Sequence, residues 1–167
     1  VPSHGGTPGA ANSRLAANIG PTFSGLRHSP VVPASLQAAT VSVETADADS
    51  VASATLFYSV SGGAFSQVAM TNSAGTWSAN IPGQNAGVVV QFYVRATDGL
   101  GATADFPAAG ASSRALIQWN NGLANLPLAH NIRLILTAAD NALLVTNSNL
   151  QADDLLGATL IYDESEV

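Results

Sequence analysis

Three aspartates in two short turn-like segments are the residues best suited to hold an ion. Asp47 and Asp49 stand in "ADADS", and Asp98 stands in "TDGLG". Calcium takes about six to eight oxygen ligands at about 2.3 to 2.6 Å, and carboxylates are among those it prefers. If the fold brings the two segments together, the carboxylates would repel one another and a calcium ion would relieve the repulsion. The alternative is that all three are turn residues whose side chains bond their own backbone.

Tyr93 and Arg95, in "VVVQFYVRATDG", form a second candidate site. Strand side chains alternate between two faces, and the neighbouring positions Val90, Phe92, Val94 and Ala96 make one face apolar. Tyr93 and Arg95 therefore belong to the outer face of this strand, where an aromatic ring can stack on a sugar. The alternative is an ordinary exposed aromatic. Trp77 alternates with Ile81 and is predicted to lie in the core instead.

The sequence contains none of the common residue patterns that support catalysis. The three histidines, His4, His28 and His130, share no metal-ligand spacing, so surface or packing roles are expected. The chain has no cysteine, no glycine-rich phosphate loop ahead of a helix and no G-x-S-x-G motif. The sequence therefore predicts a protein that is not an enzyme.

The composition of the chain limits the classes of partner that it is expected to bind. Of 167 residues, 47% are hydrophobic and only 10% are charged, and the net charge is -6, which disfavours nucleic acid. No apolar run reaches the roughly 20 residues that cross a bilayer, so membrane insertion is not expected. The chain begins at Val1 rather than Met, which suggests a processed protein or a fragment.

Residues 21–119 show short alternating runs broken by Gly, Pro and Asp, the pattern of an antiparallel sandwich of roughly 100 residues. The clearest hairpin is "ATLFYSVSGGAFSQVAM", residues 54–70. Leu56, Tyr58 and Val60 alternate with Thr55, Phe57 and Ser59 along its first strand, and residues 61–63 supply the turn.

The two regions that flank the predicted sandwich differ from it in composition and in hydrophobic pattern. Residues 1–20 are rich in Gly, Pro, Ser and Asn and have no period, so we expect an extended arm. Leu15 and Ile19 would let this arm pack on its own sandwich or on a neighbouring copy, and the second alternative predicts a homo-oligomer through residues 1–20. Residues 120–167 predict a strand over "NIRLIL", a helix over "AADNALLV" capped by Thr137 with Asp140, and a strand over "GATLIY". This small unit should lean on the sandwich or on another copy of the chain, and the alternative is a partly disordered tail.

The segments from "PTFSGLRHSP" to "ADFPAAG" resemble the bacterial immunoglobulin-like or fibronectin type III-like domain of large secreted proteins. "GGTPGAANS" resembles the end of a lamin-tail domain, and residues 130–167 resemble the first strands of a CotH kinase-like domain. The resemblance implies an extracellular or cell-surface fragment whose neighbouring domains are its partners. It also implies an immunoglobulin-like topology, in which the loops carrying Asp47, Asp49 and Asp98 emerge at one end.

Two functions follow from different classes. The first is a non-catalytic spacer that positions neighbouring domains. The second is a module that binds polysaccharide or another surface polymer through the outer face around Tyr93 and Arg95.

Overall fold

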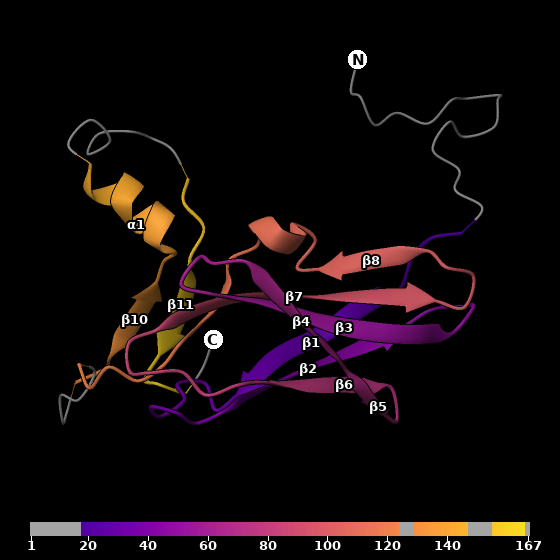
Figure 1. Cartoon of the computed structure of the whole chain (residues 1–167), viewed down its shortest axis with the longest axis horizontal. Coiled ribbons are helices and arrows are strands. Elements are labelled where there is room, and N and C mark those ends of the chain that lie inside the picture. The colour runs from indigo at the N-terminus through magenta and orange to yellow at the C-terminus, as the bar shows by residue number, and fades with distance from the viewer. Residues whose placement is uncertain (1–17, 124–128, 147–154, 166–167) are drawn as a thin grey trace, which may run out of the picture.

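The computed structural model describes residues 18–123, 129–146 and 155–165. Two layers of strands form the body, and the C-terminal elements pack at one end of it (Figure 1). In chain order the elements are β1 (Thr22–Ser29), β2 (Ala39–Ala46), β3 (Val51–Val60), β4 (Phe65–Ala69), β5 (Thr71–Ser73), β6 (Thr76–Ile81), β7 (Val89–Asp98), β8 (Thr103–Phe106), the 3-10 turn η1 (Gly110–Ser112), β9 (Ala115–Gln118), β10 (Ile132–Ile135), α1 (Ala138–Val145) and β11 (Thr159–Tyr162).

The strands of the body form two antiparallel sheets. The first sheet has the order β1-β2-β6-β5, and the second has the order β4-β3-β7, with β8 and β9 both on the far side of β7. With β8 and β9 counted together as the last strand, this is the arrangement of an immunoglobulin-like sandwich. The predicted mainly β fold, an antiparallel sandwich with a small strand-helix-strand appendage, is confirmed.

The inner faces of the two sheets make the main core, as the alternation predicts. Its fully buried members include Leu56, Val90, Val94 and Ile81. Trp77 is also buried in this core, so its predicted packing role is confirmed. Burying a large apolar side chain contributes roughly 1.5 to 3 kcal/mol, so this alternating pattern fixes which face of each strand turns inward.

The hairpin between β3 and β4 turns through residues with left-handed backbone. Ser61 has φ 50° and Gly62 has φ 76°, and the Gly63 N–H donates to the Val60 carbonyl at 2.9 Å. Two successive positive φ values are those of a type I′ turn, whose twist suits an antiparallel hairpin. The turn lies where it was predicted, and Ser61 and Gly62 take its two left-handed positions.

The last strand of the sandwich is divided into two pieces. β8 pairs with residues 94–97 of β7 and β9 pairs with residues 89–92, while the segment between them rises into η1. The Ser113 hydroxyl donates to the Phe92 carbonyl at 3.1 Å and returns the chain to the sheet edge. This detour places Arg114, the residue just before β9, beside the C-terminal unit.

The C-terminal unit consists of β10, α1 and β11. β10 and β11 pair antiparallel as a ribbon, and α1 begins at Thr137, whose hydroxyl accepts the Asp140 N–H as predicted. Ile135 and Ile161, on the inner side of the ribbon, form a second small core with Leu116 of β9. The predicted packing of this unit on the sandwich is therefore observed.

The segment before β1 also touches the sandwich. The Asn18 side-chain amide donates to the Asp98 carboxylate at 2.7 Å. Residues 1–17, with His4 and most of the predicted arm, lie outside the described residues, so self-association through residues 1–20 stays a prediction. In the part of the chain that the structure describes, no helix is long and apolar enough to cross a membrane.

Candidate functional site

The outer face of the second sheet, which points away from the first sheet, carries three aromatic rings. Tyr93 of β7 pairs directly with Phe57 of β3, and their rings stack with centroids 4.8 Å apart and planes 3° apart. Phe65 of β4 meets the Tyr93 ring edge-on, with centroids 5.4 Å apart. We call Phe57, Phe65 and Tyr93 the aromatic cluster.

Tyr93 is much less exposed than the sequence predicted. Tyr93 lies on the predicted face but is only 6% exposed, because Phe57 and Phe65 pack against its ring. Phe57 and Phe65 are themselves half-buried and present apolar surface to solvent. The alternation had placed Phe57 on the face opposite Leu56, but its contact with Tyr93 depends on the register between β3 and β7, which the sequence alone did not supply.

Arg95 stands next to the cluster and is held in a fixed orientation. Its Nε and Nη2 donate to the two carboxylate oxygens of Asp105 on β8, at 2.6 and 2.8 Å. The guanidinium carbon lies 5.6 Å from the centroid of the Phe57 ring, within the range of a cation–π contact. The hydrogen bond with Asp105 raises the pKa of Arg95, so the side chain stays charged.

The Arg95 side chain is still accessible. It is 45% exposed, and in the described residues its Nη1 makes no hydrogen bond. Flat apolar rings beside a fixed planar donor and a carboxylate are groups that suit a sugar, which has an apolar ring face and a rim of hydroxyls. Of the two predicted ligand contacts, Arg95 is therefore accessible to solvent, whereas Tyr93 is buried against Phe57 and Phe65.

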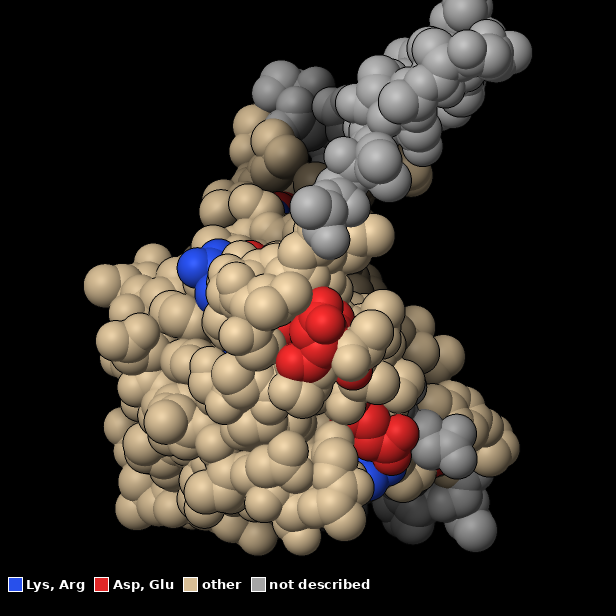
Figure 2. All heavy atoms as spheres, turned by 90° about the vertical axis from the view of Figure 1, so that its right-hand side faces the viewer, with Lys and Arg blue, Asp and Glu red and all other residues tan. Residues whose placement is uncertain are grey.

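Asp47, Asp49 and Asp98 lie at the opposite end of β7 from the C-terminal unit. The two loops meet there as predicted: the Gly99 N–H donates to the Ser50 carbonyl at 3.0 Å. The Asp47 carboxylate, however, accepts the Asp49 N–H at 2.8 Å, which is a turn contact. Acidic side chains stand in small separate groups on a mostly uncharged surface at this end of the sandwich (Figure 2).

Asp98 is engaged with its own loop. It is 2% exposed, and its carboxylate accepts the N–H groups of Leu100 and Ala102 at 2.9 and 2.8 Å. Burial opposes its ionisation, but the hydrogen bonds from Asn18, Ala102 and Leu100 outweigh burial and lower its pKa. Within residues 18–123, 129–146 and 155–165, no group of three or more His, Cys, Asp or Glu could hold a metal ion. The calcium site stays a prediction to which this geometry adds no support.

The described histidines have packing and surface roles. His28 is 7% exposed, its Nδ1 lies 3.1 Å from the Pro30 carbonyl, and its ring meets Phe92 edge-on. His130 is exposed and lies 2.7 Å from the Asp163 carboxylate.

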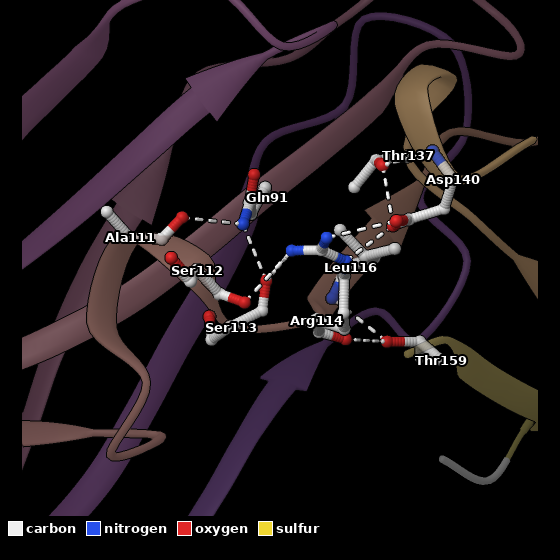
Figure 3. Close-up of polar contacts among 9 residues, drawn as sticks. All are labelled: Gln91, Ala111, Ser112, Ser113, Arg114, Leu116, Thr137, Asp140 and Thr159. Atoms are coloured by element: carbon white, nitrogen blue, oxygen red, sulfur yellow. Dashed lines mark hydrogen bonds and ion pairs between the residues drawn. The ribbon is translucent and has the colours of Figure 1, made fainter. Parts of the chain in front are cut away.

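A partly buried ion pair fixes the C-terminal unit to the sandwich (Figure 3). Arg114 donates through Nε and Nη2 to the two carboxylate oxygens of Asp140 on α1, the second bond being 3.0 Å long. The Thr159 hydroxyl of β11 donates to the Arg114 carbonyl at 2.6 Å and accepts the Leu116 N–H at 3.0 Å. Sequence reasoning found Asp140 as a capping residue but not its partner, which is 26 residues away.

An open groove of about 610 Å³ runs between the outer face of the second sheet and the start of α1. The turn after β3 and residues of β7 and β9 form one wall, and residues 134–138 with Asn141 form the other. Gln91 belongs to this groove and lies on the same face of β7 as Tyr93 and Arg95. The groove and the aromatic cluster are therefore neighbours on one surface.

Residues 31–105 match the family model described as carbohydrate binding module family 56, which is fewer than half of the residues of the chain. A crystal structure of a Br derivative of BhCBM56 is 16% identical and overlaps 41% of this chain and 71% of that chain, with a TM-score of 0.35. The fold assignment rests on the strand pairing rather than on this overlap. No curated protein matches the chain.

Proposed function

We propose that the chain is a non-catalytic module that binds polysaccharide through the aromatic cluster and Arg95. The family match carries this proposal, because residues 31–105 contain Phe57, Phe65, Tyr93, Arg95 and Asp105. Of the two functions expected from the sequence, the match favours the polymer-binding module over the spacer. Binding to a polysaccharide outside the cell would fit the expected extracellular location.

The outer face offers three features for such a ligand. Phe57 and Phe65 offer apolar ring surface, Arg95 offers an unused N–H group, and Asp105 offers carboxylate oxygens. The ion pair between Arg95 and Asp105 leaves this patch close to neutral. A neutral polysaccharide is therefore a better fit than a strongly charged one.

A pull-down with insoluble cellulose, xylan, chitin and β-glucan would test the proposal. We expect the wild-type chain to bind at least one of these, and Arg95→Ala to weaken that binding about tenfold or more, since a hydrogen bond to a charged group contributes about 1.5 to 3 kcal/mol. Arg27→Ala is the matched control, because Arg27 is an exposed arginine on β1 of the other sheet. Absence of binding by the folded wild-type chain would favour the spacer.

The spacer role, the neighbouring lamin-tail-like and CotH-like domains, and the chain being one piece of a larger surface protein stay proposals. The Arg114–Asp140 pair is the observation that favours a spacer, because it fixes the C-terminal unit against the sandwich.

A further inference from the structure

The groove beside the aromatic cluster has chemistry of its own. Its lining includes hydroxyl, amide and aliphatic side chains, and none of its lining side chains is charged. A charged ligand entering this groove would lose water without gaining an opposite charge, whereas a neutral ligand would not. Representative lining residues are Val89, Gln91, Leu116, Gln118, Ile135 and Asn141.

Two glutamines in this lining are oriented by the protein. The Gln91 amide nitrogen donates to the carbonyl oxygens of Ala111 and Ser113, which leaves its Oε1 as an acceptor. The Gln118 Oε1 accepts from Arg133 Nη1 at 2.8 Å, which leaves its amide nitrogen as a donor. The groove thus presents one fixed acceptor and one fixed donor, and a sugar hydroxyl can both donate and accept.

These glutamines are diagonal neighbours on one face of the sheet. Gln91 pairs with Leu116, and Val89 pairs with Gln118, so the four side chains share the outer face. Diagonal neighbours in an antiparallel pair lie about 7 to 8 Å apart, a spacing that lets adjacent groups of one ligand reach both amides. Val89, which is half-buried, supplies apolar surface beside them.

The groove also continues the line of the proposed binding face. Val89, Gln91, Tyr93 and Arg95 alternate along β7 on the outer face, and from Val89 to Arg95 the strand extends about 20 Å. Phe65 follows the β3–β4 turn, whose residues Ser61 and Gly62 line the groove. A polymer bound over the aromatic cluster along β7 would therefore enter the groove.

We propose that this groove is a second subsite that takes the neutral glycan chain extending past the aromatic cluster. The inference rests on the proposed function and adds to it, because the wall formed by β9, β10 and α1 lies outside residues 31–105, the span of the family match. The groove would then determine how long a glycan the protein prefers, and the aromatic cluster would determine whether a glycan binds at all.

Ala138→Trp tests the subsite by filling the groove from the first turn of α1. Ala138 is exposed and lines the groove, whereas Ala139 is exposed but not part of the lining, so Ala139→Trp is the matched control. The probes are disaccharides and octasaccharides of cellulose, xylan and β-glucan, measured by calorimetry. Circular dichroism confirms that both variants fold.

We expect the wild-type chain and Ala139→Trp to bind the octasaccharide about tenfold more tightly than the disaccharide, a gain of about 1.4 kcal/mol. Ala138→Trp should lose this gain while its disaccharide affinity is unchanged. Equal behaviour of the two tryptophan variants, or equal wild-type affinity for both lengths, would overturn the subsite and leave the proposed function standing. A folded wild-type chain that binds none of the probes, or their parent polysaccharides, would overturn both.

Discussion

The Phe57 ring lies flat on the Tyr93 ring, with centroids 4.8 Å apart and planes 3° apart. The two residues differ in exposure, because Phe57 is half-buried at the surface while Tyr93 is buried. Binding and stability should consequently respond to different substitutions. In the proposed function, Phe57 offers the face that meets a ligand, and Tyr93 holds that face in place.

Phe57→Leu should weaken polysaccharide binding about tenfold with little loss of stability. Leucine keeps an apolar cover over Tyr93 but removes the flat ring that stacks on a sugar, and swaps between apolar side chains of similar size usually cost less than about 1.5 kcal/mol. Affinity electrophoresis and thermal melting of the same sample measure both effects. An unchanged affinity would exclude Phe57 as a ligand contact.

Tyr93→Ala should mainly destabilise the sandwich. Removing a buried aromatic ring costs about 3 to 5 kcal/mol, because the cavity it leaves does not collapse fully. Urea unfolding should show this loss, and Tyr93→Phe should recover most of it. Full stability in Tyr93→Ala would contradict the supporting role of this ring.

Asp140→Asn should loosen the C-terminal unit at neutral pH. The hydrogen bond from Arg114, then that from Thr137, lowers the pKa of Asp140. Because the folded pKa lies below the ordinary value near 3.9, the stabilisation is present above that value and is lost as the pH falls through the folded pKa. We expect a loss of about 1 to 2 kcal/mol at pH 7 that shrinks below about pH 4. Unfolding of wild type and variant across pH 2 to 7 measures it, and a constant difference would contradict the assignment.

His28 should make stability depend on pH in a higher range. Burial lowers the pKa of His28, and its contact with the Pro30 carbonyl only partly opposes this effect. The unfolded chain therefore takes up a proton first as the pH falls below about 6.5, and stability decreases there. Melting temperatures at pH 7.5 and pH 5 should differ less in His28→Leu than in the wild type. The same slope in both proteins would show that other groups cause it.

Asp98→Ala should lower the melting temperature in the absence of calcium. The substitution removes the acceptor of the Leu100 and Ala102 N–H groups and of the Asn18 amide. On this geometry, millimolar calcium should leave wild-type melting unchanged. A rise with calcium that disappears in Asp98→Ala would instead establish the predicted metal site.

Much of the fold was predictable because its signals are local. The alternation in β7 identified the buried face, and Thr137 with Asp140 identified the start of α1. The meeting of the loops at Ser50 and Gly99 followed from the immunoglobulin-like topology. Each of these depends on period, capping or strand order.

The details of the site were less predictable because they depend on register and distant pairing. The burial of Tyr93 requires the alignment of β3 with β7 and of β3 with β4. The Arg114–Asp140 pair requires the detour between β8 and β9, and the groove requires the C-terminal unit to pack at one side of that detour. No local pattern specifies these contacts.

The position of two anchors determines how the sandwich would carry a mechanical load. Asn18 is tied to Asp98 at one end of β7, whereas the C-terminal unit packs near Val89 at the other end. Tension applied between these attachments acts along the strands, so it shears many hydrogen bonds at once instead of opening them one by one. The folded unit should therefore resist extension as a stiff link.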